Sequence, residues 1–179
     1  MTVSAAKQFD ARLIENIFSD CFSASFHTRL VGGAEEPLYL PETARAHAAI
    51  HYRSDYRRSA LHEVAHWCVA GPLRRGLKDY GYWYSADDRD SAKQGAFFCV
   101  EAKPQALESL FCAAAGIAFT VSVDNLSLEI PQSMLEQFEN KLRWECHQFQ
   151  KNGLPKRAEL FSQAPVSYTH LTLPTKWIV

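Results

Sequence analysis

The sequence predicts an α+β fold in a single domain, with about three principal helices packed against a few short antiparallel strands. Apolar residues recur at helical spacing over residues 5–22, 96–115 and 131–149. Short segments of strand-like composition lie between these stretches. The chain contains no internal repeat and no low-complexity linker at which a second domain would begin.

The first third of the chain predicts one helix followed by short extended segments. Residues 5–22 place Phe9, Leu13, Ile17 and other apolar side chains on one helical face. Gly32 and Gly33 then interrupt the pattern. Residues 37–41 are extended because a proline bounds them at each end, and residues 49–52 predict another short strand.

The centre of the chain predicts a short helix over residues 60–69. Ser59 is the candidate N-cap, and Gly71-Pro72 provides the stop. Residues 79–90 follow as a loop rich in aromatic and acidic residues, which could line a pocket.

The last third predicts two longer helices. The first covers residues 96–115, and Pro104 must either begin it or kink it. Residues 121–125 predict a strand that ends in a turn. Pro131 begins the second helix, and Gly153 ends it.

Length and composition favour a soluble globular domain. The 179 residues carry a net charge of -1 and are 47% hydrophobic and 22% charged. No apolar run approaches the ~20 residues of a membrane helix, and no secretory signal is evident, so we expect a cytoplasmic protein. The net charge gives no general attraction to nucleic acid. Five scattered cysteines without CxxC spacing predict reduced thiols: Cys21, Cys68, Cys99, Cys112 and Cys146.

The C-terminal end differs from the rest of the chain. Residues 165–179 lack helical periodicity and resemble an artefact of sequence assembly, so we place the domain at residues 1–164. His170, which lies in this tail, is accordingly not a candidate ligand.

The most specific motif is HExxH, formed by His62, Glu63 and His66. Residues four apart in a helix have Cβ atoms roughly 5–6 Å apart, so both imidazoles can reach one divalent ion. The alternative is that two solvated or core histidines lie beside a surface glutamate.

A third ligand is expected from another segment, because two histidines alone hold a metal weakly. Glu101 is our candidate, since it lies in an apolar stretch where an unpaired carboxylate is costly to bury. Glu108 and Asp90 are reserve candidates. The alternative is that Glu101 faces solvent or pairs with Lys103 or Arg89.

Two imidazoles and one carboxylate support two reactions. With zinc, bound water is acidified and Glu63 acts as the general base of a peptidase. With Fe(II), the same ligand set leaves positions for dioxygen and substrate, which gives hydroxylation. Ligand type does not decide between the two metals.

Basic residues gather on both sides of the HExxH helix. They suit an acidic partner, and the alternative is a solvated basic face. These residues are Arg53, Arg57, Arg58, Arg74, Arg75 and Lys78.

Four blocks of sequence resemble the elongation factor P hydroxylase family. They are RSDYRRSALHEVAHWCVAG, DYGYWYSADDRD, VEAKPQALESLFCAAAG and VSVDNL, in this order, within a resemblance that runs from about Phe9 to Ala164. The resemblance implies metal-dependent hydroxylation of the β-lysylated lysine of elongation factor P, a cytoplasmic and acidic translation factor. We also expect a monomer with no membrane partner and no direct nucleic-acid partner.

The resemblance also assigns roles to residues. It implies metal ligation by His62, His66 and Glu101, and a role for Glu63 in the second shell or as a proton carrier. Phe98 and Cys99 depart from the acidic residues expected before Glu101. Two other functions stay open at this point: a zinc metallopeptidase of HExxH type, and a non-catalytic binding module that contains a metal.

Overall fold

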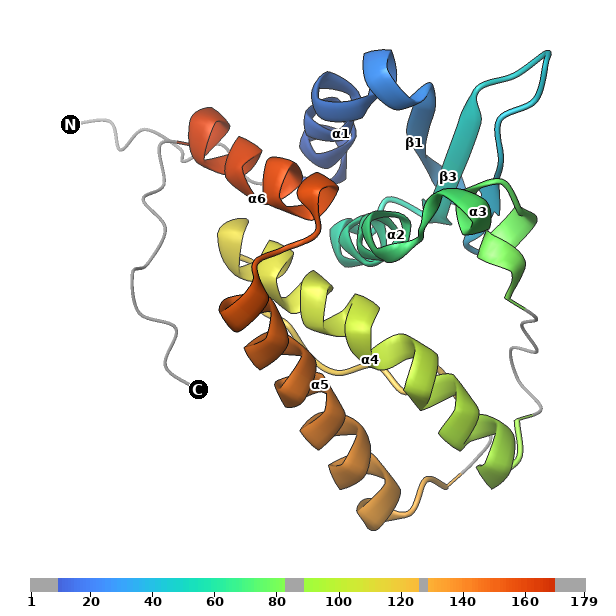
Figure 1. Cartoon of the computed structure of the whole chain (residues 1–179), viewed down its shortest axis with the longest axis vertical. Coiled ribbons are helices and arrows are strands. Elements are labelled where there is room, and N and C mark those ends of the chain that lie inside the picture. The colour runs from blue at the N-terminus through green and yellow to red at the C-terminus, as the bar shows by residue number, and fades with distance from the viewer. Residues whose placement is uncertain (1–9, 83–88, 126–128, 170–179) are drawn as a thin grey trace.

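The computed structural model describes residues 10–82, 89–125 and 129–169 (Figure 1). The α+β class is confirmed, but the described residues form six α-helices where we expected three principal ones. In chain order the elements are α1 (Ala11–Phe26), β1 (Thr28–Ala34), β2 (Leu38–Leu40), β3 (Ala48–Arg53), α2 (Arg57–Val69), α3 (Pro72–Arg75), the 3-10 helix η1 (Lys78–Gly81), α4 (Ser91–Ala114), α5 (Gln132–Asn152) and α6 (Lys156–Thr169).

The sheet has three strands in the order β1-β3-β2. β3 pairs with β2 in antiparallel and with β1 in parallel orientation, so the expectation of antiparallel strands was wrong for β1. β1 had no strand prediction because Gly32 and Gly33 interrupt its apolar pattern. A Cβ atom at Gly32 would lie 2.6 Å from the hydroxyl of Tyr52, so glycine is needed for this close approach.

Helix α2 lies at the centre of the molecule, between the sheet and α1 on one side and α4 on the other (Figure 1). Its Trp67 is fully buried, with ring centroids 5.2 Å from Phe18 and 4.8 Å from Phe22. The helix begins at Arg57, earlier than expected, and Ser59 is not its N-cap. The Ser59 hydroxyl instead accepts a hydrogen bond from the backbone N–H of Arg53.

Helices α4 and α5 pack side by side below α2 (Figure 1). Asp90 caps the N-terminus of α4 by accepting a hydrogen bond from the backbone N–H of Lys93 at 2.8 Å. The helix therefore begins before the predicted residue 96 and continues through Pro104. Pro131 is the N-cap of α5 and Gly153 its C-cap, in agreement with the predicted limits of that helix.

Residues 121–125 were predicted as a strand and are not one. They run back along α4, and side chains of that helix make the hydrogen bonds that a neighbouring strand would otherwise make. The Gln105 amide donates to the carbonyl of Ser122 and accepts from its N–H, and Gln94 donates to the carbonyl of Val123. Because these backbone groups are satisfied by side chains, the segment needs no neighbouring strand.

Helix α6 was not expected. Its Phe161 is buried and lies 4.9 Å from the ring of Phe111 on α4. The helix continues past residue 164, where we placed the end of the domain. That domain boundary stays a prediction.

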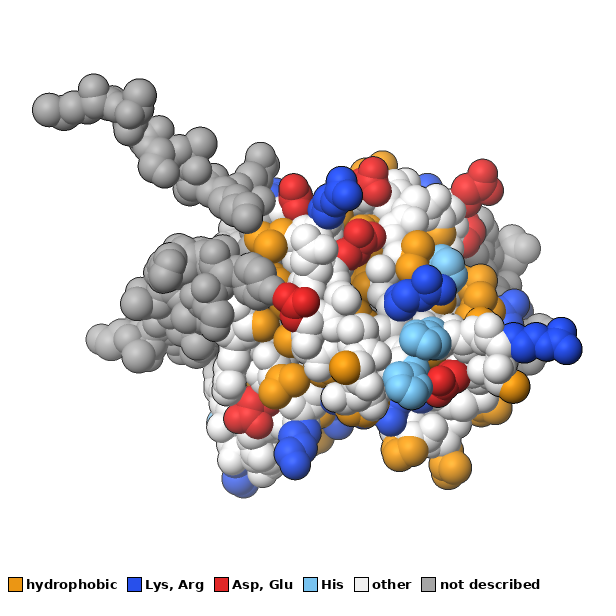
Figure 2. Space-filling view, turned by 90° about the horizontal axis from the view of Figure 1, so that it is seen from above, with side chains coloured by type: hydrophobic (Ala, Val, Ile, Leu, Met, Phe, Trp, Pro, Cys, Tyr) orange, Lys and Arg blue, Asp and Glu red, His pale blue; other side chains and the backbone are white. Residues whose placement is uncertain are grey.

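No helix in the described ranges is both long and apolar enough to cross a membrane. All five cysteines are free, and Cys68 is buried in the core, as expected for a packing residue. Figure 2 shows one face of the molecule, on which positive and negative side chains are interspersed.

Candidate metal centre

Helix α2 presents His62 and His66 to α4 because its opposite face is apolar. Leu61, Val64 and Ala65 are fully buried in the core, so the two imidazoles point to the other side. The C-terminus of the helix is held by a guanidinium: Arg157 donates to the carbonyls of Trp67, Cys68 and Ala70. The HExxH turn is thus fixed on a rigid element.

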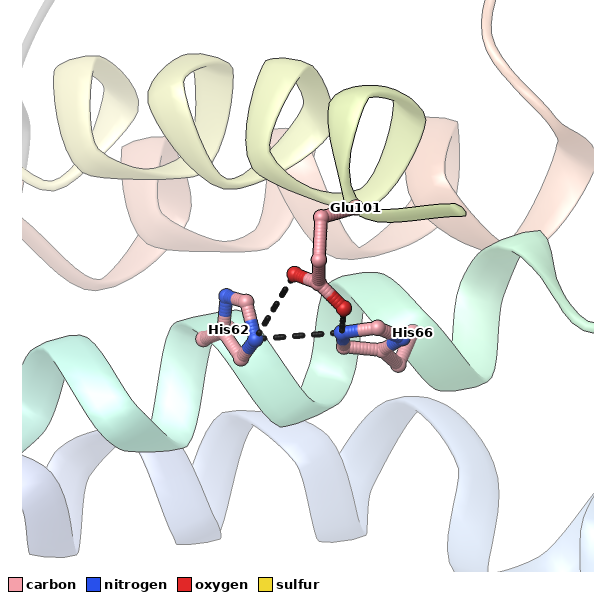
Figure 3. Close-up of side chains that lie close together, drawn as sticks. All are labelled: His62, His66 and Glu101. Atoms are coloured by element: carbon pink, nitrogen blue, oxygen red, sulfur yellow. Dashed lines mark hydrogen bonds and ion pairs between the residues drawn. The ribbon is translucent and has the colours of Figure 1, made fainter. Parts of the chain in front are cut away.

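The two imidazoles and the carboxylate of Glu101 converge on one point (Figure 3). Nε2 of His62 lies 3.0 Å from Nε2 of His66. The Glu101 oxygens lie 3.5 Å from Nε2 of His62 and 3.1 Å from Nε2 of His66. One ligand atom from each residue falls within 4.8 Å of the other two, and this is the only such group of histidine, cysteine or acidic residues that the described ranges contain.

Electrostatics favour a positive charge at this point. Burial lowers the pKa of His62, but its hydrogen bond to Glu108 and the carboxylates of Glu101 and Glu63 raise that pKa to about 10. Burial likewise raises the pKa of Glu101, but His66 and His62 lower it to about 2. A field that stabilises a proton on imidazole also stabilises a divalent cation at the same place, so the donor set fits a metal.

Glu108 orients His62 from the side away from His66. Its Oε2 accepts from Nδ1 of His62 at 2.9 Å, and its Oε1 accepts from Nη2 of Arg58 at 2.9 Å. The Glu108 side chain is 2% exposed. A proton held on Nδ1 leaves the lone pair of Nε2 directed at His66 and Glu101, which is the tautomer that binds metal.

Gln105 links the centre to the returning segment. Its amide lies 3.5 Å from Oε2 of Glu101 and also bonds both backbone groups of Ser122. Arg58 also bonds this segment, because it donates to the hydroxyl and the carbonyl of Thr120. Segment 117–125 therefore bonds polar side chains of both α2 and α4 near the centre.

Glu63 is half-buried and makes no hydrogen bond or ion pair within the described part of the chain. Burial raises the pKa of its carboxyl, and His62 and His66 partly oppose this. Nearby, Tyr80 is buried with a hydroxyl that has no hydrogen-bond partner. Burial and the Glu63 carboxylate raise the pKa of that phenol well above its usual range.

The predicted site residues differ in how their positions in the structure agree with the sequence analysis. His62, His66 and Glu101 lie together as predicted, although metal binding by them stays a prediction. The pairing of Glu101 with Lys103 or Arg89 is wrong, since its partners are the two histidines and Gln105. Asp90 is an N-cap and not a ligand.

A groove of about 500 Å³ opens beside the centre, with His66 in its wall. Its volume lies within the roughly 300–1,000 Å³ of ligand pockets. The walls come from the end of α2, the start of α3, and the facing sides of α4 and α5. From the predicted aromatic loop, Tyr82 lines this groove, whereas residues 83–88 lie outside the described ranges.

Sequence reasoning missed three features of the site. The first is Glu108, which was predicted only as a reserve ligand. The second is Arg58, which was predicted as part of a basic surface. Two other arginines of that predicted surface, Arg74 and Arg75, also bond backbone carbonyls, those of Tyr80 and Ala70. The third miss is Glu145, which is buried and lines the groove. A signal existed for it, because residues 138, 142, 145 and 149 form the buried stripe of α5 and only one of them is acidic.

Comparison with known proteins gives two results. The profile of a family described as elongation factor P hydroxylase matches residues 17–176. The elongation factor P lysine hydroxylase of Haemophilus influenzae is 42% identical over 153 residues, which are 85% of this chain and 85% of the relative. The profile match includes α2 and α4, and with them all three residues of the candidate metal centre.

Proposed function

This chain belongs to the elongation factor P hydroxylase family, and we propose that it hydroxylates the β-lysylated lysine of elongation factor P with one metal ion held by His62, His66 and Glu101. The observation that carries the proposal is the convergence of the three donor atoms within 4.8 Å. Family membership supports the substrate, and the donor set supports the chemistry.

Fe(II) is the metal that we propose. Two imidazoles and one carboxylate on one side of an ion form the set used by non-haem iron oxygenases, and zinc accepts the same donors. When bound, iron supplies the redox chemistry that inserts one oxygen atom of O2 into a C–H bond. The other oxygen atom leaves as water, after an external reductant supplies two electrons and two protons.

The residues of the protein orient the metal ligands, exclude water from the centre and transfer protons. Glu108 holds His62 in the tautomer whose Nε2 faces the centre. Glu101 contributes the anionic donor, and its near-complete burial excludes water from that side. We assign proton transfer to or from the reacting groups to Glu63, and the raised pKa of its carboxyl supports this role.

The test measures the product directly. Protein loaded anaerobically with Fe(II) should add one oxygen atom to β-lysylated elongation factor P, as detected by mass spectrometry. Glu101→Ala should abolish this, while the exposed Glu136→Gln on α5 should not. A β-lysylated lysine that still gains oxygen in cells lacking this protein would refute the proposal.

A zinc peptidase is the second candidate, and the unpaired carboxylate of Glu63 beside His62 favours it. It predicts that fully zinc-loaded protein cleaves a peptide library. Absence of cleavage would exclude it. A non-catalytic binding module, the third candidate, predicts that His62→Ala leaves the cellular phenotype unchanged.

The remaining properties follow from the proposed substrate. A translation factor as substrate places the protein in the cytoplasm, with no membrane partner and no direct nucleic-acid partner. We propose that it acts as a monomer, since one chain supplies all three donor residues.

A further inference from the structure

We propose that Glu145 determines specificity by binding an ammonium group of the β-lysyl extension on the substrate lysine. This inference rests on the proposed function, because it assigns a residue to the end of that substrate. The argument depends on the groove beside the metal centre, which His66 and Glu145 both line.

Glu145 is a largely buried residue whose carboxylate has no partner among the described residues. It is 9% exposed, and its carboxylate oxygens are not among the fully buried atoms, so they face the groove that the residue lines. An unpaired carboxylate on a largely buried side chain adds less stability than an apolar group, so it needs a reason beyond stability. Its place on the apolar stripe of α5, between Leu142 and Phe149, would suit a leucine if packing alone mattered.

None of the groove's cations among the described residues forms an ion pair with Glu145. Arg74, Lys103 and Lys141 also line it, but all three are exposed. Nζ of Lys103 lies 5.8 Å from the ring centroid of Phe149, and Nζ of Lys141 lies 5.3 Å from that of Trp144. Exposed charges are screened by water, whereas the carboxylate of a largely buried residue is screened less and attracts a cation in the groove more strongly.

Pro104 leaves a second acceptor in the groove, on the side of α4 that faces α5. Proline has no N–H, so the carbonyl of Val100 lacks its usual donor four residues later in α4. Both Val100 and Pro104 line the groove. A carboxylate and a free carbonyl together suit an ammonium group, which has three donors.

The substrate has the matching chemistry. A β-lysyl group joined through its carboxyl carbon to the lysine side chain carries two primary amines, which are protonated at neutral pH. The reacting carbon must reach the metal centre, and the β-lysyl end extends beyond it. His66 and Glu145 both line the groove, so a substrate that reaches the metal centre there can extend toward Glu145.

The test compares two forms of elongation factor P with the iron-loaded full chain. One carries β-lysylated lysine. The other carries hexanoylated lysine, which keeps the acyl chain and lacks both amines. Wild-type protein should bind the β-lysylated form at least about tenfold more tightly, and Glu145→Gln should reduce this preference to within about twofold. Glu136→Gln, the same change at an exposed site on α5, should keep it.

Kinetics and a folding control complete the test. Glu145→Gln should raise KM for the β-lysylated substrate with kcat little changed, because the contact is made before the reaction. Since Gln has nearly the same shape and no partner is lost, its thermal unfolding should match wild type. If wild-type protein adds oxygen but Glu145→Gln keeps the full preference, this inference is overturned and the proposed function stands. If wild-type protein neither adds oxygen nor prefers the β-lysylated form, both are overturned.

Discussion

The orientation of His62 by Glu108 leads to a sharp prediction for Glu108→Gln. The carboxylate accepts from two donors, Nδ1–H of His62 and the guanidinium of Arg58. A glutamine has only one oxygen to offer, so its NH2 group must face one of these donors. If that donor is His62, the imidazole must turn to the tautomer with Nδ1 as acceptor. The proton then moves to Nε2, the atom that faces the metal position.

The expected loss of metal affinity follows from this change of tautomer. Loss of a group that orients a metal-binding histidine costs roughly 10–100-fold in metal affinity, which is about 1.4–2.8 kcal/mol. Isothermal titration of metal-free protein with Zn²⁺ and, without oxygen, with Fe²⁺ measures the change. Glu136→Gln is the control, because it makes the same substitution on an exposed side chain. An affinity for Glu108→Gln equal to that of wild type would refute the role given to Glu108.

Three further predictions concern stability and proton transfer. Arg157→Met removes three hydrogen bonds to the C-terminus of α2, so urea unfolding should show a loss of about 2–3 kcal/mol; an unchanged midpoint and slope would contradict this. The pKa of His62 in the folded, metal-free protein is raised to about 10 from 6.5, so its stabilising contribution is complete below about pH 6.5 and disappears as the pH rises to about 10. Unfolding free energies of metal-free wild type should therefore fall over that range, and those of His62→Gln should be flatter; parallel curves would refute the assignment. At saturating metal, Glu63→Gln should lower kcat for hydroxylation by roughly 100-fold, and an unaltered kcat would exclude Glu63 as the proton carrier.

The residues that gather at the centre could be predicted from the sequence, but the different roles of Glu101 and Glu108 could not. The spacing of His62 and His66 follows from helical geometry, and the burial cost of Glu101 follows from its apolar neighbours. Glu101 and Glu108 share one face of α4, so periodicity alone treats them alike. Only the packing of α4 on α2 decides that Glu101 meets Nε2 and Glu108 meets Nδ1 of His62.

The fold shows the same division between local and non-local information. Helix limits set by local chemistry, such as Pro131 and Gly153 around α5, were predicted. β1 was missed because its glycine pair is explained only by the approach of Tyr52 on β3. The strand expected at residues 121–125 was wrong for a related reason. Its backbone groups bond Gln94 and Gln105 of α4, partners that its own sequence does not indicate.

The charges between α2 and α4 explain why these helices bury groups that apolar side chains would replace at no loss of stability. Three carboxylates, those of Glu63, Glu101 and Glu108, act on His62, and one guanidinium, that of Arg58, bonds Glu108. These groups carry more negative than positive charge, which raises the pKa of His62 and favours a proton on its imidazole in the metal-free protein. A divalent cation offsets the same negative charge in place of that proton. We therefore expect a metal ion to complete the charge balance of this interface, with Glu63 left to carry a proton.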